Sequence, residues 1–245
     1  MGKGSQYKTI GIIGGMGPAA TVDLMNKIIE MTDAGSDQDH IRLLVDSNTR
    51  IPDRTAAILH GGASPVPEML DSARKLESIG ADFLIMPCNT AHFFLPYLEQ
   101  EVGIPFLNMP VETARLINRK GASKAAVLAT DGTDRSGLYE KALSDAGIET
   151  LYPDEEQQKQ LMSVIYDYIK KGITEPDALP AEELRNLTDD LRARGAQVLI
   201  LACTELPLAF SLLKLDADDV IDATSVLAGA AVRAAGAELK SGSKY

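Results

Sequence analysis

The chain contains 245 residues, of which 45% are hydrophobic, so it can bury the core of one large domain or of two smaller ones. Its formal net charge of −11 argues against nucleic acid and anionic membrane surfaces as partners. No apolar run approaches the roughly 20 residues that span a bilayer, and residues 1–8 lack the apolar core of a signal peptide. Two cysteines cannot form a disulfide framework, so we expect a cytoplasmic protein.

Short aliphatic runs, each typical of a buried parallel strand, recur along the chain. They are TIGIIG (9–14), IRLLVD (41–46), DFLIM (82–86), KAAVLA (124–129), QVLIL (197–201) and DVIDA (219–223). Between them, apolar residues at three- and four-residue spacing predict amphipathic helices. The clearest are TVDLMNKIIEMT (21–32), EMLDSARKLESIG (68–80), LMSVIYDYIKKG (161–172) and AEELRNLTDDLRARG (181–195). This alternation predicts an α/β fold with parallel sheets.

The two cysteines end two strands that repeat one another. GADFLIMPC, which ends at Cys88, aligns with GAQVLILAC, which ends at Cys203, at an offset of 115 residues (203 − 88). The same offset places IGIIGGMGP (10–18) on AAVLATDGT (125–133), and both are strands that run into a glycine-containing turn. A cysteine needed only for packing would more naturally sit inside the aliphatic run, so we interpret both as functional thiols.

This repeat predicts two similar Rossmann-like domains with parallel sheets, residues 1–114 with 224–245 and residues 115–223. Ligands of open α/β sheets bind at the carboxyl ends of the strands, so we expect the active site in the cleft between the domains. Two thiols on opposite sides of a ligand suit the inversion of a stereocentre. One thiolate removes an acidic proton from one face, and a thiol on the other face returns one.

Each cysteine also precedes a predicted helix start, at Asn89–Thr90 and at Thr204–Glu205. The positive potential of a helix N-terminus favours the thiolate over the thiol, and its free N–H groups can bind a carboxylate. We therefore expect each thiol to lie where a bound anion is held.

Six motifs, in order along nearly the whole chain, carry a resemblance to a known family. They are GIIGGMGPAAT (11–21), NTRIPDRT (48–55), MPCNTAH (86–92), LATDGTDRSGLY (128–139), IYDYIKKG (165–172) and ACTEL (202–206). By these motifs the chain resembles the cofactor-independent aspartate/glutamate racemase superfamily, and within it the aspartate racemases. The resemblance implies two Rossmann-like domains with the active site between them, no pyridoxal phosphate, and a homodimer.

The resemblance also implies roles for individual residues. Cys88 and Cys203 match the two acid/base thiols of the family. The matching substrate-binding positions are Asn89, Thr90 and Thr204 for the α-carboxylate and amino group, Met16 and Thr130 for the pocket lining, Arg54 and Lys170 for the side-chain carboxylate, and Glu205 in the second cysteine motif. Asp131 departs from the family pattern, because an uncharged residue is expected there and an extra negative charge is unfavourable beside an anionic substrate.

Other interpretations stay open. GMGPAA (15–20) fits a dinucleotide-binding fingerprint with Asp46 as a ribose ligand, although Asp46 lies 31 residues beyond Gly15 (46 − 15) rather than about 20. Cys88 and His92, at helical spacing, could bind zinc, but the chain has only two other histidines, so we expect no metal. A non-catalytic two-lobed binding protein would need the cleft but not the thiols.

The sequence therefore predicts an amino-acid racemase that needs no cofactor and interconverts L- and D-aspartate by proton transfer at the α-carbon. A glutamate or broad-specificity amino-acid racemase is the alternative, because pocket shape cannot be read from sequence. Beyond the small amino-acid substrate, the only expected partner is a second copy of the chain, with no nucleic acid and no membrane.

Overall fold

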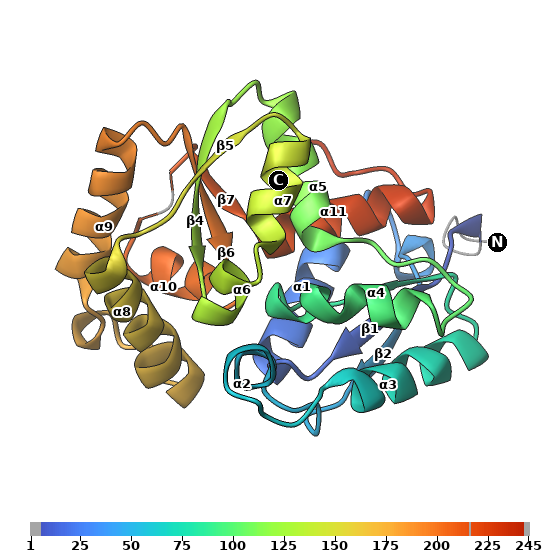
Figure 1. Cartoon of the computed structure of the whole chain (residues 1–245). Coiled ribbons are helices and arrows are strands. Elements are labelled where there is room, and N and C mark those ends of the chain that lie inside the picture. Colours follow the sequence, from blue (N-terminus) through green and yellow to red (C-terminus); the bar gives the residue numbers. More distant parts are fainter. Residues whose placement is uncertain (1–5, 216, 243–245) are drawn as a thin grey trace. The chain divides into compact units, whose positions relative to one another are not determined.

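The computed structural model describes residues 6–215 and 217–242, so the sequence predictions for residues 1–5 and 243–245 lie outside the described residues. Contacts divide the chain into two compact units, Met1–Glu112 with Thr224–Tyr245 and Thr113–Ala223. Both units contain a parallel sheet and helices (Figure 1), which confirms the predicted α/β class. That each unit is a domain in its own right stays a prediction.

Unit 1, the first of these, is built on a three-stranded parallel sheet in the order β2-β1-β3. The strands are β1 (Ile10–Gly14), β2 (Leu43–Ser47) and β3 (Phe83–Ile85). The central strand β1 is buried at every position, and this explains its continuous aliphatic sequence. Leu84 of β3 also forms a parallel bridge with Phe106, which extends the pairing beyond β3.

Two helices of unit 1, α1 (Pro18–Met31) and α3 (Val66–Ser78), correspond to the amphipathic patterns predicted at 21–32 and 68–80. The others are η2 (Asp37–Asp39), α2 (Arg54–Leu59), the 3₁₀ helix η3 (Thr90–Phe94), α4 (Leu95–Glu99), the start of α5 (Met109–Arg119) and nearly all of α11 (Ala223–Ala235). The end of the chain is tied back into this unit. Lys8 N–H donates to the Ala235 carbonyl at 2.9 Å, and Lys240 N–H donates to the Met31 carbonyl at 2.8 Å.

Unit 2, residues Thr113–Ala223, has a four-stranded parallel sheet in the order β5-β4-β6-β7. The strands are β4 (Lys124–Ala129), β5 (Glu149–Leu151), β6 (Val198–Ala202) and β7 (Val220–Asp222). β4 coincides with the predicted run, and β6 and β7 agree with their predictions within one residue at each end. β5 was not predicted. It is a short edge strand with no buried residue, so its sequence lacks an aliphatic run.

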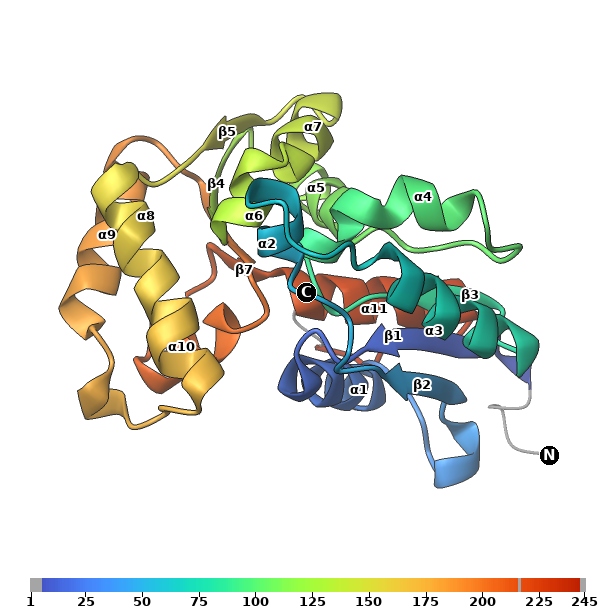
Figure 2. The same cartoon turned by 60° about the horizontal axis from the view of Figure 1, so that its bottom comes forward.

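The remaining helices belong to unit 2. They are α6 (Asp131–Arg135), α7 (Leu138–Asp145), α8 (Glu155–Ser163), η4 (Val164–Tyr168), η5 (Ile169–Lys171), η6 (Pro176–Ala178), α9 (Ala181–Ala193) and α10 (Leu206–Leu212). The coil labelled α8 in Figure 2 runs on beyond Ser163. The segment predicted as one helix over 161–172 changes type along this coil: α8 continues as a π-helical turn, η4, and then as a 3₁₀ turn, η5. Gly172 ends it in the left-handed conformation, at φ 78°, which suits glycine.

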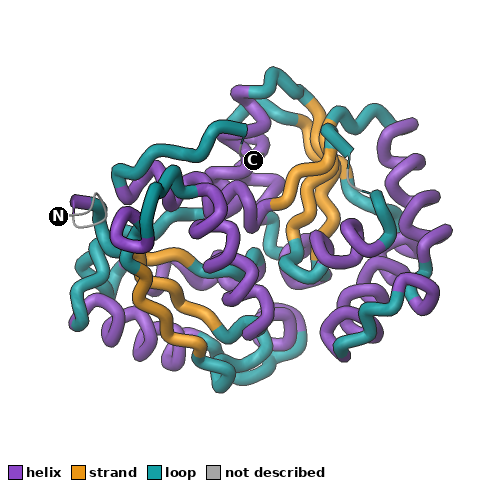
Figure 3. The backbone as a smooth tube through the Cα atoms, turned by 180° about the vertical axis from the view of Figure 1, so that it is seen from behind, coloured by secondary structure: helices purple, strands orange, loops and turns teal. Residues whose placement is uncertain are grey.

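The sequence repeat corresponds to a repeated sheet pattern. In each unit a central strand, β1 or β4, lies between the cysteine strand, β3 or β6, and an edge strand, β2 or β5. Figure 3 draws the strands of both sheets in orange. The offset of 115 residues maps the first residue of the paired segment of β1, Ile10, onto Ala125 of β4, and Phe83 of β3 onto Val198 of β6. It fails for the edge strands, because β5 begins 106 residues after β2 (149 − 43). The described part of the chain contains no helix long and apolar enough to cross a membrane.

Candidate active site

Cys88 lies just past the carboxyl end of β3, on the edge of the sheet where β1 also ends. Ile12 pairs with Ile85, so the turn after β1 and the segment that carries Cys88 leave the sheet together. Cys88 is 7% exposed and packs in one buried cluster with Met16. The predicted pocket residue Met16 and the predicted catalytic thiol thus belong to the same buried cluster of unit 1.

Arg54, Asn89 and Thr90 complete the candidate residues of unit 1. Asn89 and Thr90 are buried directly after the thiol. The Arg54 guanidinium donates to the Met16 carbonyl at 3.4 Å and to the Pro52 carbonyl at 3.0 Å. These bonds place Arg54 beside the Met16 turn, which itself packs in the cluster of Cys88.

Arg54 is the first residue of the short helix α2. Asp53 caps this helix: its carboxylate accepts a hydrogen bond from Ala56 N–H at 2.7 Å. The Asp-Arg pair in the sequence therefore marks a helix start, and the cap fixes the backbone from which the guanidinium extends.

His92 anchors the backbone of Cys88. Its Nδ1–H donates to the Cys88 carbonyl at 2.9 Å, and Met109 N–H donates to its Nε2 at 3.1 Å. Burial lowers the pKa of His92 to about 4, so the ring is neutral near pH 7, as this pair of bonds requires. Both ring nitrogens are engaged, which leaves no lone pair for the zinc ion considered above. Among the described residues no group of three His, Cys, Asp or Glu side chains could hold a metal.

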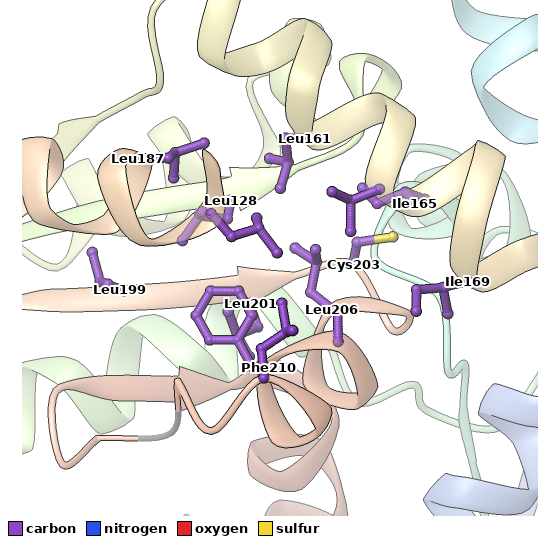
Figure 4. Close-up of a cluster of buried hydrophobic side chains, with 14 of the residues drawn as sticks. Leu128, Leu161, Ile165, Ile169, Leu187, Leu199, Leu201, Cys203, Leu206 and Phe210 are labelled. Atoms are coloured by element: carbon purple, nitrogen blue, oxygen red, sulfur yellow. The ribbon is translucent and has the colours of Figure 1, made fainter. Parts of the chain in front are cut away.

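Cys203 immediately follows β6 in unit 2, and Thr130 immediately follows β4. Since Ala129 pairs with Ala202, these two residues leave the same edge of the sheet side by side. Cys203 is 7% exposed and belongs to a buried cluster with Ile165, Ile169 and others, shown in Figure 4. Thr130 is also buried, and its hydroxyl caps α6 by accepting from Thr133 N–H at 3.4 Å.

Glu205 connects three of the candidate residues. The Cys203 thiol donates to Oε2 of Glu205 at 2.9 Å, and the Thr204 hydroxyl donates to the same oxygen at 3.2 Å. The other oxygen, Oε1, lies 2.8 Å from Nζ of Lys170, whose ammonium is 5.3 Å from the centre of the Tyr166 ring. Cys203, Thr204, Glu205 and Lys170 are thus assembled in unit 2 around one carboxylate.

These contacts determine the pKa values of the Cys203 thiol and the Glu205 carboxyl group. Burial, and then the Glu205 carboxylate, raise the pKa of the Cys203 thiol well above its ordinary value, while Lys170 opposes them. Burial works to raise the pKa of Glu205 as well, but Lys170 and the Cys203 thiol outweigh it and hold that pKa below its usual range. The backbone N–H of Glu205, at the start of α10, does favour the Cys203 thiolate as expected, but burial and the neighbouring carboxylate outweigh it and favour the thiol.

The link between Glu205 and Lys170 was missed because 35 residues separate them in sequence (205 − 170). The link to Cys203 did have a signal. A carboxylate two residues after a cysteine at a strand end can turn back to the thiol.

Asp131, the departure from the family pattern, is engaged away from the thiol. Its carboxylate accepts from Nε2 of Gln158 at 2.8 Å, and the same amide donates to the Ala129 carbonyl at 3.0 Å. Asp131 lines a cavity of about 540 Å³ within unit 2, bordered also by Asp134, Glu155 and Lys159, and neither Thr130 nor Cys203 lines it.

Comparison with known proteins identifies the family. The model of the Asp/Glu/hydantoin racemase family matches residues 13–231. The solved structure of Picrophilus torridus aspartate racemase shares 36% identity and a TM-score of 0.83, covering 95% of this chain and 96% of that one. The broad-specificity amino-acid racemase RacX of Bacillus subtilis is 31% identical over 80% of this chain and 85% of its own length.

A glutamate racemase of Persephonella marina is more distant, at 26% identity over 65% of this chain and 61% of its own length. The family model, the aspartate racemase structure and the broad-specificity relative all point to one family. The chain belongs to the Asp/Glu/hydantoin racemase family, and it is an enzyme, an amino-acid racemase.

Proposed function

We propose that this enzyme interconverts L- and D-aspartate by a two-base mechanism in which Cys88 and Cys203 act on opposite faces of the α-carbon. The observation that carries the proposal is the repeated placement of the thiols: each follows the strand next to the central strand of its sheet, at the carboxyl edge. One thiolate removes the α-proton, and the other thiol returns a proton from the opposite side.

The proposed binding residues surround the two thiols within their own units. Asn89 and Thr90 follow Cys88, and Thr204 follows Cys203. In the proposed mechanism their side chains donate hydrogen bonds to the substrate's α-carboxylate and accept them from its amino group. Met16 packs with Cys88, and Thr130 leaves the sheet beside Cys203, which supports their role in lining the pocket. The mechanism needs no cofactor, because the thiols supply both proton transfers.

Aspartate is proposed over other amino acids for two reasons. The aspartate racemase of Picrophilus torridus is similar over nearly the full length of both chains. Arg54 also presents a planar, permanently charged group that can bind a side-chain carboxylate through two hydrogen bonds. The relatives named as a broad-specificity racemase and a glutamate racemase make those substrates the alternative.

We also propose that the enzyme is a homodimer and that it works in the cytoplasm. Both cysteines are free thiols, which a reducing compartment preserves. Light scattering on the purified protein measures the oligomeric state, and a mass of one chain would refute the dimer.

Racemisation without cofactor is the first test. The purified protein, incubated with a panel of L-amino acids and no additive, is expected to form D-aspartate fastest, as measured by chiral chromatography. In heavy water the α-proton should be replaced by deuterium as racemisation proceeds, because the returning proton comes from a thiol that exchanges with solvent. Activity that required added pyridoxal phosphate or a nicotinamide would refute the proposal, and faster turnover of glutamate would refute the substrate.

Removal of either thiol is the second test. Cys88→Ala and Cys203→Ala should each lower racemisation about 10²- to 10⁴-fold, the usual contribution of general acid–base catalysis. Circular dichroism and thermal melting serve as controls for folding. A variant that kept more than about a tenth of wild-type activity would exclude its cysteine as an acid/base. If the wild type racemises no amino acid and both variants bind their ligand as tightly as the wild type does, the result would favour a non-catalytic binding protein.

A further inference from the structure

The Cys203 thiol has a neighbour that the two-base mechanism does not require. A mechanism with two thiols is complete once one is a thiolate and the other a thiol. Yet the Cys203 sulfur lies 2.9 Å from a carboxylate oxygen of Glu205, whose side chain is only 12% exposed. Such a neighbour resists formation of the thiolate, because two negative charges would then be in contact.

Lys170 stabilises the Glu205 carboxylate beside the thiol. Its ammonium lies 2.8 Å from the second Glu205 oxygen, and the Lys170 side chain is 27% exposed, so the Glu205 carboxylate is paired as well as largely buried. The π-helical turn η4 and the 3₁₀ turn η5 that follow α8 bring Lys170 to this position, with the Tyr166 ring beside the ammonium. The charged groups that act on the thiol are thus Glu205 and Lys170, while the phenols of Tyr166 and Tyr168 pack against the same cluster.

We propose that Glu205 and Lys170 are positioning residues that hold Cys203 as the proton donor of the resting enzyme. This inference rests on the proposed function. In the donating step the S–H bond of Cys203 breaks, its electron pair stays on sulfur, and the proton forms the new bond to the α-carbon. The electron pair for that bond is the one released when the thiolate on the opposite face takes the original α-proton.

The same pair also serves the reverse reaction. A sulfur whose thiolate is made less favourable by Glu205 is a stronger base once that thiolate has formed, and abstraction of a weakly acidic α-proton needs a strong base. Lys170 limits the free-energy cost of forming the Cys203 thiolate beside the Glu205 carboxylate, because its positive charge attracts both negative groups. Lys170 accordingly acts on Cys203 through Glu205.

The test is the pH dependence of alkylation at the two thiols. The intact enzyme is treated with iodoacetamide over a range of pH, and mass spectrometry of the two cysteine peptides gives a rate for each thiol. Glu205→Gln keeps the size of the side chain and removes its charge. We expect the midpoint of Cys203 alkylation to fall by about 1 to 3 pH units, the usual effect of a neighbouring charge, while Cys88 in the same sample does not move.

Lys170→Met should shift the Cys203 midpoint in the opposite direction, to higher pH, and Lys170→Arg should restore it. Lys171→Met is the matched control, because Lys171 pairs with Asp167 on the surface and should leave both thiols unchanged. An unchanged or raised Cys203 midpoint in Glu205→Gln would overturn the proposal, as would an unchanged or lowered one in Lys170→Met. If Glu205→Gln does not fold, Lys170→Met decides alone.

Racemisation provides an independent measurement. The enzyme should lose kcat/KM for aspartate at high pH where Cys203 ionises, and Glu205→Gln should move this loss to lower pH by the same shift as the alkylation midpoint. If kcat/KM of Glu205→Gln falls at the same high pH as that of the wild type, Cys203 is not the proton donor. If the thiol midpoints shift as expected but no amino acid is racemised, the proposed function fails while the coupling of Glu205 to Cys203 stands.

Discussion

At the scale of single residues, Arg54 shows how a charged group can be held in place before a ligand binds. Its guanidinium donates to three backbone carbonyls, those of Met16, Ile51 and Pro52. A side chain fixed in this way loses little conformational freedom when it binds a carboxylate, so more of the interaction energy remains for affinity.

Replacement of Arg54 tests the choice of substrate. A hydrogen bond to a charged group contributes about 1.5 to 3 kcal/mol, so Arg54→Gln should lower kcat/KM for aspartate about 10- to 150-fold. Alanine and asparagine have no side-chain carboxylate and should be affected much less. Arg50→Gln is the matched control, because Arg50 lies nearby with a side chain that is 74% exposed. Equal losses for aspartate and alanine would show that Arg54 supports the fold and does not select the substrate.

At the scale of elements, η3 is held to the start of α5 by one neutral imidazole. His92 bonds Cys88 on one side and Met109 on the other, so the position of the thiol's backbone depends on the ring staying unprotonated. The unfolded chain binds a proton at His92 near pH 6.5, whereas the native state does so only near pH 4. Between these values the unfolded state holds more protons, so the free energy of unfolding should fall as the pH falls.

The expected loss from pH 6.5 to pH 4 is on the order of 3 kcal/mol from His92 alone. Urea denaturation at several pH values measures it, and His92→Gln should show a correspondingly shallower pH dependence, whatever its absolute stability. His60→Gln, at an exposed histidine, is the control and should keep the wild-type slope. The same slope in His92→Gln and wild type would contradict the assignment of a buried neutral ring.

The elements that could be predicted from the sequence are those that burial shapes directly. β4 is buried at five of its six positions, and the aliphatic run in the sequence defines it fully. The edge strand β5 and the change from α8 to a π-helical turn leave no periodic signal, because packing against the rest of unit 2 determines them. The thiols could be located from strand ends, but the contact between Lys170 and Glu205 exists only once the chain is folded.

At the scale of the whole molecule, α11 joins the last part of the chain to the first. Deletion of residues from Thr224 onward should open unit 1 and spare unit 2, because the contacts of this segment place it in unit 1. Hydrogen exchange measured by mass spectrometry should then show lost protection in the β1 peptide and retained protection in the β6 peptide. A chain that ends after Lys240 keeps the bond from Lys240 to Met31 and should behave like the full chain. Equal loss in both peptides would show that the two units unfold together.

The interrupted course of unit 1 also has a consequence for biosynthesis. A ribosome releases the chain from its N-terminus, so every strand of unit 2 has been made before α11 exists. Unit 2 can therefore reach its native form on the nascent chain while unit 1, although begun first, still exposes the apolar side chains that α11 will contact. Unit 1, which carries Cys88, therefore completes its folding last. We expect chaperones to bind newly made chains at the segments of β1 and Cys88 rather than at the segment of Cys203.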